Sequence, residues 1–267
     1  MIIGDPDYDG PGAAAKPGCR PPSKAPPARG GRRALRESAN LSGFSRLCES
    51  GVEADRIGKI LADAKILTLD DATEEAVKSL WGPRILHIAT HGFAVQELSW
   101  PRSWFSPAYQ MWWTIPDYDV LADDPMWRSG LALAGFNARQ SPAGHDDGVL
   151  SAAEASLLNL NGTQLVVLSA CDSGLGLARA GEGVFGLRKA FALAGARAET
   201  FSLWPVADRT TVDFMTRYYE LLAQGHGNAE ALAMVKREFI DRRTDPWSQP
   251  WAWAVFVGYG YSGPLAK

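Results

Sequence analysis

The chain has 267 residues, of which 46% are hydrophobic and 21% are charged, and its formal net charge is −3. This composition is typical of a globular protein with an ample core, and the small negative charge argues against nucleic acid or an anionic membrane as a direct partner. No apolar run approaches the roughly 18 residues of a membrane span, and three cysteines are too few for a disulfide framework. These features together predict a cytoplasmic protein.

The apolar pattern predicts alternating strands and helices. In chain order these are a strand ending at 1–4, a helix at 51–64, a strand at 66–69, a helix at 70–80, a strand at 84–90, a short helix opened by Ser151, a strand at 163–170, a helix at 181–195, a strand at 198–204, helices at 209–225 and 228–242, and a strand at 252–260. Such alternation indicates a mostly parallel sheet covered by helices on both faces.

Local signals predict details of several helices. The helix at 51–64 is expected to bury one apolar side, formed by Val52, Ile57, Ile60 and Leu61. The helix at 70–80 is expected to begin with Asp71 as its cap.

Two further signals mark helix ends. Ser151 is followed three residues later by Glu154, which is the pattern of a capping box. Gly195 lies at the expected stop of the helix at 181–195.

Two stretches are expected to be irregular. Residues 10–31 are rich in Pro, Gly, Ala and basic residues, and they are predicted to form a flexible loop. Residues 97–124 form a tryptophan-rich insertion, which either lines a substrate groove, docks a partner, or packs as a hairpin on the body of the domain.

Reactive side chains follow two of the predicted strands. The strand at 84–90 is followed by His91 and Gly92, and the strand at 163–170 is followed by Cys171. If these strands are neighbours, both side chains emerge at the carboxyl edge of the sheet, where sites form in open parallel sheets. An imidazole near a thiol favours the nucleophilic thiolate, and the N–H groups of Gly92 and Cys171 are candidates to stabilise an oxyanion.

Each of these residues also has a purely structural interpretation. A lone cysteine is more often a small buried hydrophobe, and a lone histidine is more often structural. The shared position of His91 and Cys171 at strand ends beside glycine favours a functional role. His87 is interpreted as a core residue, because four residues along a strand separate it from His91 by about 13 Å, too far to share a metal ion.

Five stretches carry a resemblance to a known family. They are "RILHIATHGF", "RSGLALAG", "DGVLSAAEASLLNLNGTQLVVLSACDSGLG", "GEGVFGLRKAFALAGARAETFSLWPVAD" and "PWAWAVFVGYG". They resemble the CHAT domain, a caspase-like peptidase domain often joined to TPR repeats and akin to separase. The resemblance covers nearly the whole chain, so we expect a single domain over 1–267, excised from a longer chain.

The resemblance implies a fold and roles for individual residues. It implies a caspase-like α/β sandwich with a central sheet of about six strands, and no metal or organic cofactor. His91 takes the place of the catalytic histidine, Cys171 that of the nucleophile, and Gly92 an oxyanion donor. Asp172 is a candidate for the first specificity pocket, or it is a surface carboxylate or turn cap. Ser169 stands where related metacaspases have an acid that selects basic residues.

The leading hypothesis is therefore a cysteine endopeptidase that cleaves a specific protein substrate and is switched on by a regulatory protein or a fused repeat domain. The alternative from another class is a caspase-like scaffold that binds and signals without catalysis. A nucleotide-binding α/β domain is disfavoured, because the chain lacks both the dinucleotide fingerprint and a phosphate-binding loop.

Overall fold

The fold is seen in a computed structural model of the chain. It describes residues 1–10, 44–94, 126, 129–138, 146–169, 186–204, 208–242 and 246–266. Of the loop expected at 10–31 only residue 10 is therefore described, and the tryptophan-rich insertion at 97–124 lies outside the described residues.

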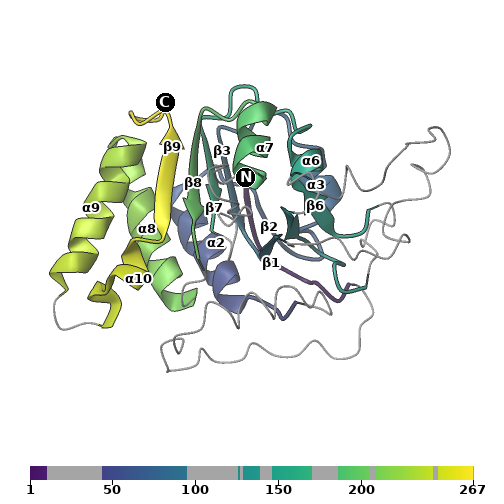
Figure 1. Ribbon diagram of the computed structural model, residues 1–267, viewed down its shortest axis with the longest axis horizontal. Coiled ribbons are helices and arrows are strands. Elements are labelled where there is room, and N and C mark those ends of the chain that lie inside the picture. Colours follow the sequence, from purple (N-terminus) through teal and green to yellow (C-terminus); the bar gives the residue numbers. More distant parts are fainter. Residues whose placement is uncertain are drawn as a thin grey trace, which may run out of the picture.

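The centre of the protein is a six-stranded sheet with the order β2-β1-β3-β7-β8-β9 (Figure 1). Its strands are β1 (Ile2–Pro6), β2 (Ile66–Leu69), β3 (Ile85–Ala89), β7 (Leu165–Leu168), β8 (Ala198–Ser202) and β9 (Phe256–Gly260). All neighbouring strands are parallel except β8 and β9, which are antiparallel. The predicted mostly parallel sheet is thus confirmed, and the strands predicted as neighbours, β3 and β7, lie side by side.

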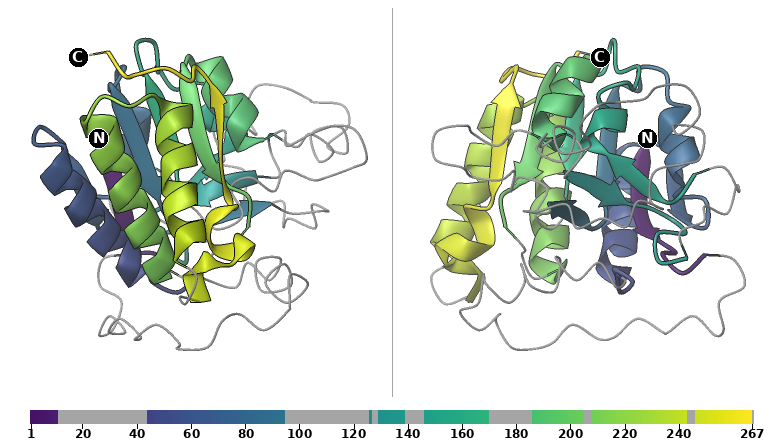
Figure 2. Two further views of the ribbon diagram at one scale, coloured as in Figure 1. Left: turned by 90° about the vertical axis from the view of Figure 1, so that its left-hand side faces the viewer. Right: turned by 45° about the vertical axis from the view of Figure 1, so that its right-hand side comes forward.

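Helices cover both faces of this sheet (Figure 2). One layer holds α2 (Cys48–Ile60), α8 (Asp208–Ala223) and α9 (Asn228–Asp241). The other holds α3 (Glu74–Lys78), α6 (Ala152–Ala155) and α7 (Leu187–Ala194). A short 3-10 helix η3 (Pro246–Ser248) and α10 (Pro250–Trp253) connect α9 to β9. The arrangement confirms the predicted three-layer α/β sandwich.

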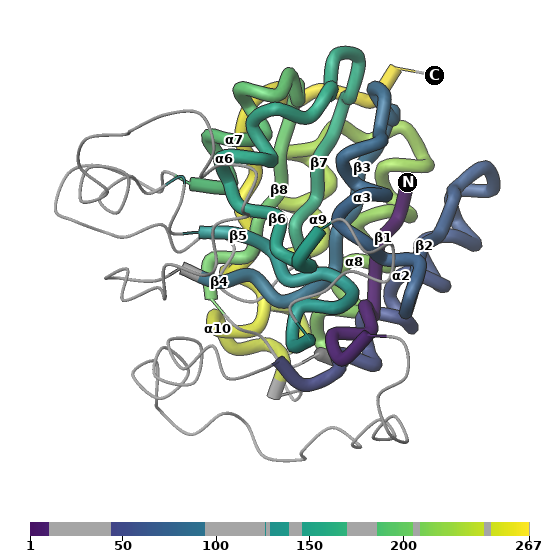
Figure 3. The backbone as a smooth tube through the Cα atoms, turned by 90° about the vertical axis from the view of Figure 1, so that its right-hand side faces the viewer, coloured from purple at the N-terminus to yellow at the C-terminus, as the bar shows by residue number. Residues whose placement is uncertain are grey.

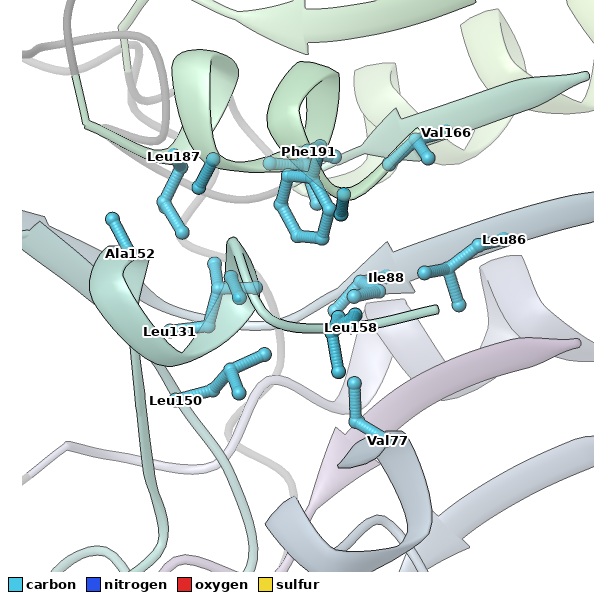
Figure 4. Packing of buried hydrophobic residues seen from close by; sticks show 14 of the residues in the cluster. Val77, Leu86, Ile88, Leu131, Leu150, Ala152, Leu158, Val166, Leu187 and Phe191 are labelled. Carbon is cyan, nitrogen blue, oxygen red and sulfur yellow. The ribbon is translucent and has the colours of Figure 1, made fainter. Parts of the chain in front are cut away.

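Alternating side chains of the strands build two separate cores. In β3, Leu86 and Ile88 join the cluster that also holds Val166 and Phe191, beneath α3, α6 and α7 (Figure 4). Ile85 joins the opposite cluster beneath α2, α8 and α9. Because both faces are buried, the strands need apolar residues at successive positions, which explains their near-continuous apolar runs.

A second, three-stranded sheet was not predicted from the sequence. It has the antiparallel order β4-β5-β6, with β4 (Gly92–Ala94), β5 (Ser129–Ala132) and β6 (Val149–Ser151). Its strands run across the direction of the main strands (Figure 3). They are only three or four residues long, so they show too few alternations to stand out in the sequence.

The predicted face of α2 is partly wrong. Val52 is 41% exposed, whereas Glu53, Ala54 and Ile57 are buried. The helix begins at Cys48 rather than at residue 51. Glu53 was overlooked as a buried position because an acid is rarely buried without a partner, and its partner comes from a distant strand.

The structure tests two predicted helix caps: the prediction for α3 is wrong, and the prediction for α6 is confirmed. The cap of α3 is Thr73, not Asp71, since the Thr73 hydroxyl accepts a hydrogen bond from the backbone N–H of Ala76 at 3.1 Å. The capping box at Ser151 is confirmed, because Ser151 and Glu154 each bond the other's backbone N–H.

The structure also tests the predicted end of α7 and the predicted start of β9. Gly195 ends α7 in the left-handed conformation with a φ of 109°, as predicted. The last strand begins at Phe256 rather than at residue 252, because Pro250 at the first helical position opens α10.

Two chain-wide expectations were also tested. Cys48, the one cysteine among the described residues, is disulfide-bonded, and the low cysteine count did not predict this bond. Within the described ranges, every helix is too short or too polar to cross a membrane.

Candidate active site

The carboxyl edge of the main sheet holds the predicted catalytic histidine. β3 ends at Ala89 and β7 ends at Leu168, and the two strands are parallel, so both chains leave the sheet at the same edge. Ser169 continues this pairing by donating its N–H to the carbonyl of Ile88 at 3.0 Å. Cys171 and Asp172 lie outside the described residues.

The His91 ring is held by a segment that precedes α2. Its Nε2 lies 2.9 Å from the carbonyl oxygen of Ser45. Phe44 stacks on the ring, with centroids 4.5 Å apart and planes 16° from parallel, and Tyr8 packs at 5.4 Å. The imidazole is therefore fixed on one edge by a hydrogen bond and on its faces by aromatic rings, while the residue remains partly exposed.

This geometry determines which ring nitrogen can act as a base. A backbone carbonyl only accepts hydrogen bonds, so Nε2 must carry the proton that His91 donates to Ser45. In the neutral ring, Nδ1 then carries the lone pair. Among the described residues, none hydrogen-bonds Nδ1, so within this part of the chain the nitrogen can accept a proton.

The surroundings also keep the ring neutral at physiological pH. Burial lowers the pKa of His91 from its ordinary value of 6.5 to about 4, and the hydrogen bond to Ser45 opposes this shift only in part. A neutral imidazole can accept a proton, whereas a charged one cannot. The site thus presents His91 in the form that a general base requires.

A closed set of hydrogen bonds fixes the backbone at His91. The His91 N–H donates to the Tyr8 hydroxyl at 3.4 Å. This Tyr8 hydroxyl lies 2.9 Å from the Thr90 hydroxyl. The Thr90 hydroxyl donates to the carbonyl of Ala132, and the Ala132 N–H returns to the carbonyl of His91 at 2.8 Å. The histidine is therefore tied both to the chain after β1 and to β5.

Gly92 has the geometry needed to offer its N–H group. It lies opposite Leu131 in the antiparallel pair β4-β5. Because the flanking residues His91 and Ala132 make the hydrogen bond, this is a non-hydrogen-bonded pair, and the Gly92 N–H points away from β5. β4 is the outer strand of its sheet, so among the described residues no further strand pairs with this N–H.

Three residues of the site were missed in the sequence analysis. Tyr8, Phe44 and Ser45 hold His91 but lie in loops with no periodic pattern. Ser45 contributes a backbone carbonyl, which any residue could supply, so its side chain gives no signal in the sequence.

His87, the histidine within β3, is a core residue, as predicted. His87 is fully buried, and its Nδ1 lies 3.0 Å from the Tyr219 hydroxyl, while its Nε2 lies 3.0 Å from Oε1 of Glu53. In the described part of the chain, no group of three or more His, Cys, Asp or Glu side chains has the arrangement of a metal site.

The three-layer fold, with His91 at the carboxyl edge of its main sheet, is typical of one class of protein. A three-layer α/β sandwich of this kind is the fold of caspase-like cysteine peptidases. The family model of the CHAT domain matches residues 1–261, so the chain belongs to the CHAT domain family. A comparison with curated proteins gave no match.

Proposed function

We propose that the protein is a cysteine endopeptidase in which His91 and Cys171 form the catalytic dyad. The observation that carries this proposal is the state of His91: Nε2–H is held by Ser45, Nδ1 bears the lone pair, and burial keeps the ring neutral.

The register of the two strands supports the pairing of these residues. Each partner pair between β3 and β7 is separated by 80 residues, as in Ile85 with Leu165 and Ile88 with Leu168. His91 and Cys171 are also separated by 80 residues. Each lies three positions beyond the last partner pair, Ile88 with Leu168, which favours side chains that approach one another beyond the edge.

The proposed reaction uses these groups in sequence. His91 Nδ1 accepts the thiol proton of Cys171, and the thiolate attacks the carbonyl carbon of the scissile peptide bond. The N–H groups of Gly92 and Cys171 stabilise the resulting oxyanion. The His91 imidazolium then protonates the leaving amine, and water hydrolyses the thioester to release the second product and restore the thiol.

The proposal also covers the substrate, the activation of the enzyme and the role of Asp172. We infer a specific protein substrate and activation by a regulatory protein or a fused repeat domain, as the family resemblance implies. Asp172 is proposed to contact the substrate residue before the cleaved bond. No metal or organic cofactor has a part in these steps.

The test compares cleavage and thiol reactivity in matched variants. A peptide mixture is incubated with the wild type, Cys171→Ala, His91→Ala and His226→Ala, which changes a histidine outside the proposed site, and new termini are identified by mass spectrometry. Loss of Cys171 or His91 is expected to lower kcat/KM by about 1000-fold or more. His226→Ala is expected to retain the wild-type rate.

Alkylation separates the peptidase from a silent scaffold. Near neutral pH, iodoacetamide is expected to modify Cys171 faster in the wild type than in His91→Ala. Equal rates in the two proteins, or cleavage that persists in Cys171→Ala, would contradict the proposed dyad and favour a domain that only binds.

A further inference from the structure

The Ser45 carbonyl that orients His91 belongs to an exposed stretch of chain outside any strand or helix. Residues 44–47 precede α2, and Ser45 itself is exposed. An exposed loop carbonyl is normally mobile and bonded to water. A fixed hydrogen bond to the imidazole therefore requires that neighbouring residues hold the backbone in place.

The first anchor is the amide of Asn137, which lies in the turn after β5. Asn137 Oδ1 accepts the N–H of Phe44 at 2.7 Å, and its Nδ2 donates to the carbonyl of Phe44 at 3.0 Å. The same Nδ2 donates to Oδ1 of Asp9 at 2.7 Å, and the Asn137 N–H donates to the carbonyl of Tyr8 at 2.7 Å. One side chain thus joins Phe44 to the chain after β1.

The second anchor is an ion pair on the other side of Ser45. Arg46 donates from Nε to Oδ1 of Asp5 at 2.8 Å and from Nη2 to Oδ2 of Asp5 at 2.6 Å. Asp5 is itself fixed, since it is buried, its N–H donates to the Ser50 hydroxyl at 2.8 Å, and its φ of 48° places it in the left-handed region. A two-point guanidinium–carboxylate contact restricts both position and direction.

The two anchors hold the residues on either side of Ser45, whose carbonyl oxygen orients His91. Phe44 is held by Asn137, Arg46 is held by Asp5, and Ser45 lies between them with its oxygen on His91 Nε2. The carbonyl can therefore neither swing away nor rotate without breaking one of these contacts. Phe44 is held in the same way against the face of the imidazole.

We propose that Asn137 and Asp5 are positioning residues of the active site, which fix the Ser45 carbonyl and thereby select the tautomer of His91. Neither side chain touches the imidazole, so each acts through the segment 44–46. The effect on rate rests on the peptidase function proposed above. The effect on His91 itself does not, and it can be measured without any substrate.

The experiment uses the full chain labelled with ¹⁵N, and it follows the ring nitrogens of His91 by NMR across a pH titration. Assignment comes from the loss of signals in His91→Ala. Asn137→Ala removes the first anchor and Asp5→Asn weakens the second while keeping its size. Asn161→Ala, in the exposed turn at the opposite edge of the sheet, is the matched control.

The wild type and Asn161→Ala are expected to show one tautomer, protonated at Nε2, and titration near pH 4. In Asn137→Ala the ring is expected to populate both tautomers, and its pKa should rise towards 6.5 as Phe44 leaves and water enters. Asp5→Asn is expected to change the tautomer populations and the pKa of His91 in the same direction, but by less than Asn137→Ala does. With a peptide that the wild type cleaves, kcat in Asn137→Ala should fall about 100-fold with little change in KM.

The outcomes separate this proposal from the previous one. An unchanged tautomer and pKa in both Asn137→Ala and Asp5→Asn would overturn the positioning role, whatever the activity. Mixed tautomers in Asn137→Ala, found together with cleavage that persists in Cys171→Ala, would support the positioning role and count against the proposed dyad. Unchanged amide signals of the core strands confirm that the variants are folded.

Discussion

His87 and His91 lie four residues apart in the sequence, yet they occupy opposite kinds of surroundings. His87 is fully buried beneath α2 and α8; its Nδ1 lies 3.0 Å from the Tyr219 hydroxyl, and its Nε2 lies 3.0 Å from Glu53 Oε1 without a hydrogen bond. His91 lies past the end of the strand, with one nitrogen on a backbone carbonyl and the other without a partner among the described residues. The difference teaches that a histidine becomes structural when the fold buries both of its ring nitrogens among side chains, and that it can react when one of them lies beyond the end of a strand.

The largest expected effect is on stability, and it should separate the two residues. His87→Ala leaves the Glu53 carboxyl and the Tyr219 hydroxyl buried without their partner, and it opens a cavity. The free energy of unfolding should fall by about 3 to 5 kcal/mol. His91→Ala removes a partly exposed ring and should cost about 1 kcal/mol. Urea unfolding at pH 7 measures both, and equal losses would remove the distinction.

A second difference concerns pH, because burial lowers the pKa of His91 to about 4. The unfolded chain binds a proton at this residue near pH 6.5, whereas the folded chain resists until about pH 4. Stability contributed by the neutral ring is therefore complete above pH 6.5 and is lost as the pH falls towards 4. His91→Gln should lose about 3 kcal/mol less than the wild type between pH 7 and pH 4.

Urea unfolding at several pH values in this range measures that difference. His226→Gln serves as the control, since it removes a histidine from the turn between α8 and α9. A wild type and a His91→Gln variant with parallel pH profiles would show that the ring is not held neutral by the fold.

The smallest expected effect compares two tyrosine hydroxyls, one beside each histidine. Tyr219→Phe removes the partner of His87 Nδ1 and should lower stability by about 1 to 2 kcal/mol without moving the NMR signals of His91. Tyr8→Phe removes the hydroxyl that joins Thr90 to the His91 N–H, and it should cost about 1 kcal/mol and shift the His91 signals. The reverse pattern of shifts would contradict the assignment of one tyrosine to each histidine.

Much of the fold could be predicted from the sequence, because buried parallel strands need continuous apolar runs. The runs around His87 and Val167 predicted the positions of β3 and β7, whereas their adjacency was a condition that the structure meets. The caps at Ser151 and Gly195 were predictable because their signals are local. By contrast, the cap at Thr73 was missed, since Asp71 is an equally good candidate by residue type.

The site was predictable only where chemistry resides in side chains at strand ends. His91 and Gly92 follow β3 as expected, and the family pattern assigns their roles. The neutral state of His91 was not predictable, because it depends on burial of the ring by residues distant in the sequence, such as Phe44. Its tautomer was not predictable either, because the Ser45 carbonyl that selects it lies 46 residues away. A contact made by a backbone carbonyl leaves no requirement on the residue type that supplies it.

The short sheet has a consequence for how the imidazole can move. The chain passes from β3 through His91 directly into β4, and the carbonyl of His91 accepts the N–H of Ala132 from β5. The residue thus belongs to the connection between the two sheets. A small tilt of the three-stranded sheet would therefore move the His91 backbone, and a force applied to β5 or β6 would displace the ring.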